Sequence, residues 1–527
     1  MIRDSSPPSL PGAGRPTDDL QTTRSYRVGG RWILSWRILI AVVGSLAFLF
    51  VVLLSVIVIN AIKARSRQMH ITRVKSIEPL PGYVDRLAQA IQQKTIASEL
   101  PGQTDPASFR ALHALLEKSF PAVHARLLRE VHGRLSLLYR WQGADPSREP
   151  ILLMSHLDVV PVEAGTEVRW HHPPFSGAVA DGFIWGRGAL DVKSGALGLL
   201  EAVERLLADG FQPACDVYLS LGHDEEEGGH EGNRRIAEIL RQRGIKFRFV
   251  LDEGGALTQG IIEGISNPVA LVGIAEKGHA TISLKTHGPN GHSSMPPSPT
   301  AVGRIASAVH HLQSNPFPPR LDGAVEVMLD YLGPELPWPG RVALANRWLT
   351  RGLVVRQLVQ KPALNALIRT TMAPTIARGG ETANVLPAEA ETLVNLRILP
   401  GESTESTLKY VRSAVADAQV ACELVGTRSE PSTVSSTESE SFLVLQRTIA
   451  EVFPEAIVVP GLCLAATDSH HFQAIAADTY RFLPIRVSTD DLERIHGVDE
   501  RIGVEDYARL VGFLSRLIVN LSDMKNK

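Results

Sequence analysis

The chain has 527 residues, of which 44% are hydrophobic and 21% are charged. A domain usually has about 100–200 residues, so this length predicts more than one domain. The composition excludes a mostly disordered chain, a collagen and a coiled coil. The 54 basic and 56 acidic residues leave a formal net charge of −2, so the chain lacks the basic surplus that a nucleic-acid partner requires. The three cysteines form no CxxC pair and predict no disulfide framework.

Residues 38–59 form an uncharged, apolar run near the N-terminus. A helix rises about 1.5 Å per residue, and about 20 residues span the hydrocarbon core of a bilayer. We therefore expect one transmembrane helix at 38–60, after a disordered tail at 1–37 and before a linker at 61–75. A buried core helix and a cleaved signal peptide are the alternatives. The run is longer than either usually requires, and 61–63 lacks a small residue at its third position for cleavage.

Basic residues flank both sides of this run, so the positive-inside rule does not decide its orientation. They are Arg24, Arg27, Arg31 and Arg37 before the run, and Lys63, Arg65, Arg67, Arg73 and Lys75 after it. A short N-terminal tail before a large body is typical of a signal anchor whose body is exported. The sequence thus predicts a single-pass membrane protein with its body on the extracytoplasmic side.

The body that follows has the pattern of an α/β fold. Residues 151–154 are a fully apolar run, as expected of a buried parallel strand, and further strands are expected at 217–221 and 247–251. A helix from about 194 to 209 lies between the first two strands. The order strand, helix, strand implies right-handed crossovers and a parallel sheet. Ligands of such sheets bind at the carboxyl ends of the strands.

Polar clusters follow each of these strands directly. They are Ser-His-Leu-Asp at 155–158, Gly-His-Asp-Glu-Glu-Glu-Gly-Gly at 222–229, Asp-Glu-Gly-Gly at 252–255, and a glycine-rich cluster at 186–193 that opens the helix. The carboxylates outnumber the nearby lysines and arginines, and buried carboxylates without partners are costly, so cations are expected at this edge. Adjacent glutamates can divide the work, because one can bind a metal while the other takes a proton from water.

The pattern changes at about Lys277, where alternating strands at 280–284 and 390–398 and a helix capped by Ser403 predict a separate α+β domain. We place this domain at 277–430, between catalytic segments at 76–276 and 431–527. Its stretch 320–370 carries several large apolar residues, namely Trp338, Leu344, Trp348, Leu349, Leu353, Val354 and Leu358. One interpretation is extra helical core of the inserted domain. The other is an apolar wall for a long acyl group, or a contact with the nearby membrane.

Seven motifs, taken in chain order, resemble those of the M20 metallopeptidase family over about residues 75–520. They comprise 154–158, Trp170 with 173–175, 186–193, 224–226, 251–254, 382–387 and 494–498. The carboxypeptidase S and PM20D1 branch, related to aminoacylase-1, fits best. The resemblance implies a zinc-exopeptidase-like α/β catalytic domain with a mainly parallel sheet. This domain would be interrupted by an α+β lid and dimerisation domain.

The resemblance also implies a metal site with two zinc ions bridged by Asp191. One ion would be held by His156 and Asp252, and the other by Glu226 and His496. Cobalt or manganese in the same site is an alternative, because these ligand types do not forbid it. In two further alternatives, Glu253 replaces Asp252 as a ligand, or His471 binds a metal.

The same resemblance assigns catalytic roles. Glu225 would be the general base, and Asp158 would orient the ring of His156. His292 in the lid would polarise the scissile carbonyl and stabilise its oxyanion, acting across a dimer if the lid joins two copies.

Asn384 and Arg397 would assist the transition state and hold the substrate, together with His470, which stands where relatives often carry an arginine. The function implied is a membrane-anchored dizinc hydrolase of an amide next to a C-terminal amino acid. Its substrate would be a short peptide or an N-acyl amino acid. The alternative is a non-catalytic metal-binding or scaffold protein on the same fold, and the intact Glu225 argues against it.

Overall fold

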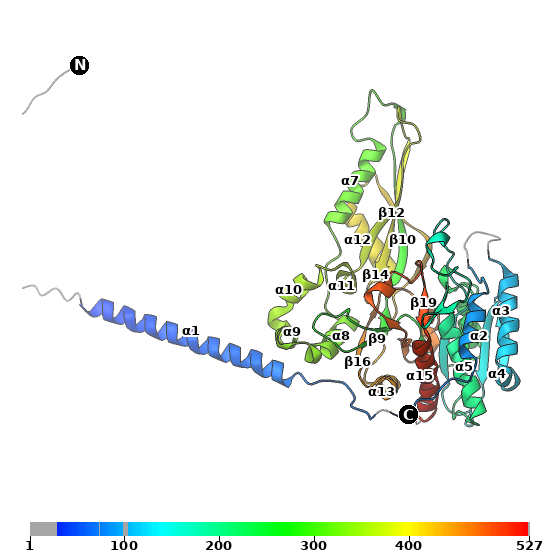
Figure 1. The fold of residues 1–527 in the computed structure, drawn as a ribbon. Coiled ribbons are helices and arrows are strands. Elements are labelled where there is room, and N and C mark those ends of the chain that lie inside the picture. Colours follow the sequence, from blue (N-terminus) through cyan, green and yellow to red (C-terminus); the bar gives the residue numbers. More distant parts are fainter. Residues whose placement is uncertain (1–28, 73, 98–103, 525–527) are drawn as a thin grey trace, which may run out of the picture. The chain divides into compact units, whose positions relative to one another are not determined.

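The computed structural model describes residues 29–72, 74–97 and 104–524, and it divides the chain into two units, 1–59 and 60–527 (Figure 1). Of the tail predicted to be disordered at 1–37, residues 1–28 lie outside the described residues, whereas 29–37 belong to a helix. The two units are described separately below.

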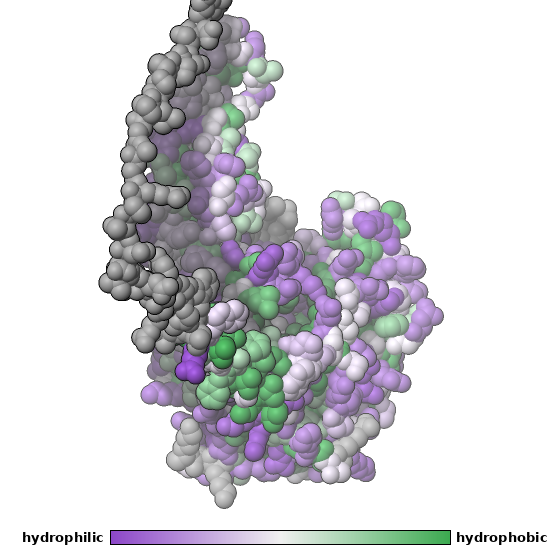
Figure 2. All heavy atoms as spheres, turned by 90° about the vertical axis from the view of Figure 1, so that its left-hand side faces the viewer, coloured by the Kyte–Doolittle hydropathy of each residue, from purple (hydrophilic) through white to green (hydrophobic). Residues whose placement is uncertain are grey.

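One long helix, α1 (Gly29–Lys63), forms most of the described part of the first unit, and its last residues, 60–63, belong to the second unit. It contains the predicted span 38–60 and starts before it. The part Trp36–Lys63 is long and apolar enough to cross a membrane, with a mean hydropathy of 3.0. Its apolar side chains are exposed, for example Phe48 at 68%. In Figure 2, hydrophobic side chains (green) gather in one compact group. A helix of this kind is either a membrane anchor or a signal sequence.

A ten-stranded sheet forms the centre of the second unit. In spatial order its strands are β1 (Leu128–His132), β2 (Ser136–Trp141), β6 (Val217–Gly222), β3 (Ile151–His156), β7 (Phe249–Asp252), β17 (Thr479–Arg481), β9 (Val269–Glu276), β8 (Leu257–Thr258) and β18 (Arg486–Val487), with β16 (Ile457–Cys463) paired to β9. The central strands β6, β3, β7 and β17 are parallel, whereas β1, β2 and β8 pair antiparallel with β2, β6 and β9. This confirms the predicted α/β fold with a mainly parallel sheet.

Helices cover this sheet. They are α2 (Tyr83–Ile91), α3 (Pro106–Ser119), α4 (Pro121–Arg126), α5 (Lys193–Ala208), α6 (Asn233–Gln242), α13 (Glu440–Val452) and α15 (Val504–Ser522). The predicted helix at 194–209 is α5, which is buried almost all round because it lies between β3 and α15. Gly198 makes this close packing feasible, since a Cβ there would meet a Leu510 methyl at 2.3 Å.

Short elements join these helices and strands near the sheet edge. They are η1 (Glu167–Arg169), η2 (Glu225–Glu227), η4 (Asp468–Ile475), α14 (Thr489–Leu492) and a small sheet of β4 (Val179–Ala180), β5 (Phe183–Trp185) and β19 (Arg501–Gly503).

The inserted α+β domain is built on a four-stranded antiparallel sheet. Its elements are β10 (Gly278–His287), β12 (Thr371–Arg378), β14 (Glu389–Ile398), β15 (Ala421–Ser429), α7 (Ala301–Ser314), α12 (Thr404–Val415) and the pair β11 (Gly291–His292) and β13 (Val385–Leu386). Alternate residues of β10 and β14 pack against the two helices, so the period-two pattern marks the buried face. Ser403 caps α12 in a capping box, as predicted.

The stretch 320–370 forms α8 (Ala324–Leu332), η3 (Gly333–Glu335), α9 (Trp338–Ala345), α10 (Arg347–Leu358) and α11 (Pro362–Leu367). Its buried residues, among them Leu344 and Val354, cluster with Ile265, Val269 and Val459 of the catalytic sheet. They take no part in the core of the inserted domain. The interpretation as extra helical core of that domain is therefore wrong, because α8 packs on β16 instead.

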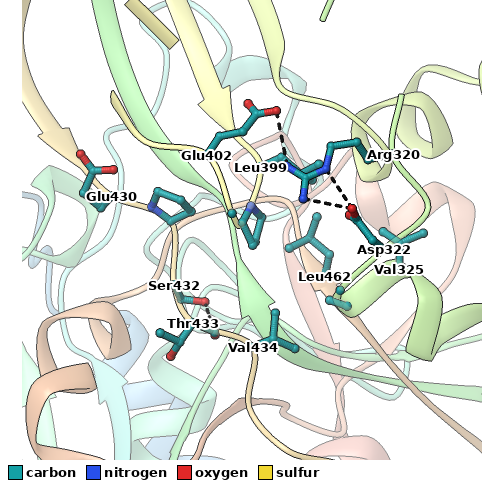
Figure 3. A pocket seen from close by; sticks show the side chains of 15 residues that line it. Arg320, Asp322, Val325, Leu399, Glu402, Glu430, Ser432, Thr433, Val434 and Leu462 are labelled. Atoms are coloured by element: carbon teal, nitrogen blue, oxygen red, sulfur yellow. Dashed lines mark hydrogen bonds and ion pairs between the residues drawn. The ribbon is translucent and has the colours of Figure 1, made fainter. Parts of the chain in front are cut away.

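A cavity of about 400 Å³ lies where the inserted domain joins the catalytic body. It is lined by α8 and by two connecting segments, 399–402 and 430–434. Figure 3 shows Arg320 pairing with Asp322 at 3.1 Å and with Glu402 at 3.8 Å. These charges thus balance one another within the cavity wall.

Candidate metal centre and active site

The carboxyl ends of the parallel strands bring most of the predicted metal ligands together. His156 is the last residue of β3 and lies opposite Gly222, the last residue of β6. The turn η2, which carries Glu225 and Glu226, follows β6, and Glu253 follows β7. Because these strands run side by side and end at the same edge, side chains far apart in sequence meet there.

Two groups of side chains at this edge have the spacing of metal sites, and they share Asp191. The first contains His156, Asp191 and Glu253, and the second contains Asp191, Glu226 and His496. Asp191 Oδ1 lies 3.0 Å from His156 Nε2, and Asp191 Oδ2 lies 3.0 Å from His496 Nε2. Each oxygen of one carboxylate thus faces a different histidine, which is the arrangement that a carboxylate between two ions requires.

Of the two carboxylates considered at this position, Glu253 lies in the first group among the described residues, and Asp252 does not. Both oxygens of Asp252 accept backbone hydrogen bonds, from Glu253 N and from Ser469 N, each at 2.9 Å. The carboxylate of Asp252 therefore fixes the turn after β7. The side chain of the next residue, Glu253, is the one that reaches Asp191 and His156.

The charge of this cluster fits bound cations. Glu226 Oε1 is buried, accepts no hydrogen bond and lies 3.3 Å from His496 Nε2. Burial and the carboxylate of Asp191 raise the pKa of Glu253 well above its usual range. The carboxylates of Asp191 and Glu226 raise the pKa of His496 to about 10. The negative charge of the cluster therefore keeps protons bound to its own members. Divalent cations bound at this place would neutralise that negative charge instead.

Glu225 belongs to neither group of ligands but lies beside them. Its Oε2 is 3.9 Å from His156 Nε2. Burial raises the pKa of Glu225 well above its usual range, an effect opposed by His156 and reinforced by Asp468. Glu225 thus lies beside the candidate metal ligands without being one of them, and its pKa is raised. These are the properties of a general base.

Asp158 positions this glutamate more directly than it positions the histidine. Its Oδ1 accepts from Glu225 N at 3.2 Å, and its Oδ2 accepts from Glu226 N at 3.0 Å. The ring of His156 lies closer to the backbone oxygen of Asp158, 3.0 Å from Nδ1, than to its carboxylate at 3.5 Å. The predicted orienting role thus falls on the backbone carbonyl, while the carboxylate fixes η2.

A buried glutamate that the sequence did not single out, Glu500, braces the bridging aspartate. Its Oε1 accepts from the backbone N–H groups of Gly188, Leu190 and Asp191 at 2.8–3.1 Å. Its Oε2 accepts from Arg187, whose other guanidinium nitrogen donates to His496 O at 3.0 Å. One carboxylate and one guanidinium thus tie the loop of Asp191 to the loop of His496. No residue spacing signals this role, because three of its four partners are backbone amides.

A charged cavity of about 510 Å³ adjoins His496. Arg169, Arg187, Glu493 and Arg494 line it. It gives the metal groups an open, polar side toward solvent.

His292 and Asn384, which are predicted to act in catalysis, lie together in the inserted α+β domain, the predicted lid. They lie outside both metal groups. His292 pairs with Val385 between β11 and β13, and Ser293 N donates to Asn384 O at 3.0 Å. His292 is exposed, and its Nδ1 lies 2.8 Å from Ser294 Oγ. The lid therefore presents His292 and the Asn384 segment side by side on its surface.

Arg397 and His470 both act electrostatically on a half-buried histidine, His279, which the sequence analysis did not single out. His279 lies opposite Arg397 in the β10–β14 register. Burial, then the charges of Arg397 and His470, lower the pKa of His279 to about 4. Three cationic or basic side chains thus gather near the base of the lid.

The other histidine alternative, His471, is not part of either metal group among the described residues. Its Nε2 lies 3.0 Å from Gly228 O, and burial together with His470 lowers its pKa to about 3.

The fold and these side chains are those of a metal-dependent hydrolase on an α/β scaffold. Residues 152–520 match the model of Peptidase family M20/M25/M40. The chain therefore belongs to this family and is a metallopeptidase or amidohydrolase by class. This confirms the resemblance inferred from the motifs.

Similar proteins share most of the chain. "Probable carboxypeptidase S-like 2" of Dictyostelium discoideum is 39% identical over 485 residues, which cover 90% of this chain and 92% of that protein. "N-fatty-acyl-amino acid synthase/hydrolase PM20D1" of Homo sapiens is 38% identical over 454 residues, covering 85% and 88%. The solved M20 family metallo-carboxypeptidase Sso-CP2 from Sulfolobus solfataricus has a TM-score of 0.64 at 17% identity, covering 84% of this chain and 100% of that one, which shows the same fold.

Proposed function

We propose that this protein is a membrane-anchored dizinc hydrolase that cleaves the amide bond next to a C-terminal amino acid. The observation that carries the proposal is the pair of ligand groups that share Asp191, with Glu225 beside both and part of neither. The first ion would be held by His156, Asp191 and Glu253, and the second by Asp191, Glu226 and His496. The non-catalytic alternative leaves Glu225, which is only partly exposed, without a role.

Two bound divalent ions would polarise the scissile carbonyl and lower the pKa of the attacking water. Glu225 takes a proton from this water while the water oxygen bonds to the carbonyl carbon. When the carbon–nitrogen bond breaks, Glu225 returns the proton to the leaving amine. His292 would donate a hydrogen bond to the oxyanion, and Asn384 would assist it.

The cations near the base of the lid would hold the carboxylate of the substrate. Arg397 provides a permanent charge, and His279 lies within the electrostatic reach of both Arg397 and His470. A negatively charged C-terminus at this place would offset their mutual repulsion. The names of the relatives include both carboxypeptidase and N-fatty-acyl-amino acid hydrolase, so the substrate class is a peptide or an N-acyl amino acid.

The decisive experiment measures release of free amino acid by the full chain in detergent. The panel contains dipeptides and N-acyl amino acids, and the metal content is measured in parallel. Glu225→Gln should lower turnover by about 10²–10⁴-fold with both metals retained, while the exposed Glu231→Gln provides a matched control with unchanged turnover. The panel then separates peptidase from acylase. Full turnover in Glu225→Gln, or none in the metal-loaded protein on any substrate, would count against the proposal.

The proposal places α1 across a membrane and the catalytic body on the extracytoplasmic side. The exposed apolar surface of α1 supports an anchor, because no described side chain buries it. Protease added to intact cells should digest the body. A body that survives until the cells are lysed would reverse the orientation.

The proposal also includes a homodimer formed through the lid. Large apolar side chains are exposed on the lid, namely Met295, Val302, Ile376 and Val385. A second copy that covers them would also bring its His292 to the neighbouring active site.

A further inference from the structure

Helices α9 and α10 expose four large apolar side chains, Trp338, Trp348, Leu349 and Leu353, at 51%, 63%, 51% and 55%. We call these residues, with the exposed Arg351 and Arg356 on α10, the α9–α10 surface. Single exposed apolar residues are ordinary, but several on consecutive helices mark a surface that binds something.

The charge of this segment differs from that of the rest of the chain. Residues 338–361 contain five basic residues and no acidic residue, whereas the whole chain has a net charge of −2. Tryptophan and leucine interleaved with arginine are typical of helices that lie in the interface of a bilayer with anionic head groups. A second copy of this chain is a poorer partner, because two such basic surfaces would repel each other.

Contacts within the second unit fix α9 to the end of the apolar helix α1. The guanidinium of Arg341 donates to Ala61 O at 2.8 Å and to Ala64 O at 2.6 Å, so it caps carbonyl groups at the end of α1. Asn60 Nδ2 donates to Asn346 Oδ1 at 3.0 Å, and Ala61 is fully buried. The chain therefore leaves its apolar segment directly beside α9 and α10, whichever direction the helix takes.

The next residues continue this attachment along the body. Arg67 pairs with Asp330 of α8 at 3.6 Å. The side chain of Gln68 donates to Val458 O at 3.0 Å and accepts from Val458 N at 2.8 Å. The segment that follows α1 is thus held to the body at several points, so the α9–α10 surface cannot swing far from the place where the chain leaves the apolar segment.

We propose that the α9–α10 surface binds the surface of the bilayer in which α1 is anchored. Its tryptophans and leucines would enter the boundary between head groups and acyl chains, and Arg351 and Arg356 would contact anionic head groups. The inference rests on the proposed anchoring by α1. It gives the catalytic body a fixed orientation on the membrane, where an amphiphilic substrate would concentrate.

The test uses the full chain reconstituted in vesicles of phosphatidylcholine with phosphatidylglycerol. A fluorophore attached through cysteine reports contact with quencher-bearing lipids, and the native Cys215, Cys422 and Cys463 are buried. The probe position is Leu353→Cys. Leu128→Cys on β1, where the leucine is 61% exposed, is the matched soluble control, and Leu46→Cys, also at a 61% exposed leucine, reports on α1 itself.

We expect the lipids to quench the probes at 353 and 46 but not the probe at 128. Quenching at 353 should grow with the phosphatidylglycerol fraction and fall in the Arg351→Gln/Arg356→Gln variant. If the probe at 46 is quenched while that at 353 behaves like that at 128, the surface proposal is overturned and the anchor stands. If neither is quenched, the anchor fails as well. The probe at 353 could also be shielded from solvent in detergent, without vesicles, in a protein that cross-links as a dimer. This result would assign the surface to a second copy and overturn the proposal.

Discussion

At the residue scale, two adjacent carboxylates at the end of β7, Asp252 and Glu253, have different roles. Asp252 accepts two backbone hydrogen bonds, whereas Glu253 faces Asp191 and His156. We expect Glu253→Gln to lose metal from the first group. Asp252→Asn should keep the metal but lower the free energy of unfolding by about 1–3 kcal/mol, because one buried amide loses its acceptor. Metal analysis after dialysis and thermal unfolding check both. Metal loss in Asp252→Asn alone, with full metal content in Glu253→Gln, would restore the ligand set implied by the family resemblance.

A buried histidine that belongs to neither metal group predicts how stability depends on pH. The ring of His113 lies on α3 with its Nε2 3.0 Å from Leu135 O, and burial together with Arg129 lowers its pKa to about 4. The unfolded chain binds a proton at this residue below about pH 6.5, and the folded chain does not until about pH 4. His113 therefore favours unfolding increasingly as the pH falls through this window.

The cost reaches roughly 2–3 kcal/mol at the acid end. His113→Gln has no such proton, so its stability relative to the original chain should improve as the pH is lowered from 7.5 to 5. Thermal unfolding of both proteins over this range measures the difference. Parallel pH profiles would show that His113 is protonated in the folded protein.

At the scale of elements, the packing of α5 against α15 depends on Gly198. Replacing a helix glycine by alanine usually stabilises a helix by about 1 kcal/mol. In Gly198→Ala, however, the added methyl group would meet Leu510 at 2.3 Å, and overpacking costs about 1–3 kcal/mol. We expect a net loss of stability. Gly352→Ala on α10 is the matched control, since a Cβ there meets nothing within 4 Å, and it should be neutral or stabilising in thermal unfolding.

The sequence predicted the parts of the site that follow from strand order. His156, Asp191, Glu226 and His496 meet as expected, because parallel strands deliver the residues after their carboxyl ends to one edge. The choice between neighbouring carboxylates after β7 depends on how the backbone turns, which the residue pattern does not encode. The role of Glu500 is equally hidden, since three of its four partners are backbone amides.

The helices at 320–370 show a similar limit at a larger scale. Their apolar residues predicted helices, but an apolar face does not specify which sheet it covers. Only the structure shows that α8 packs on β16 of the catalytic body and that α9 and α10 leave part of their apolar surface exposed.

At the scale of the whole molecule, the proposed dimer makes a prediction that a monomer cannot satisfy. If His292 acts in the active site of the partner, Glu225→Gln and His292→Gln each inactivate both sites of a homodimer. A mixed dimer of the two variants contains one complete site, because the protomer with an intact Glu225 receives an intact His292 from the other. The purified mixed dimer should therefore have about one half of the original turnover, and an unfractionated random mixture about one quarter.

Co-expression of differently tagged variants, followed by tandem purification and turnover measurement, tests this. Co-expressed Glu225→Gln and Glu226→Gln form the control, because both residues lie in one η2 turn of the same protomer and no complete site can form. Recovery only in the first pair would establish a site shared between two copies. Equal inactivity in both mixed dimers would mean that His292 serves its own chain, and the lid would then have to close on the metal groups within one protomer.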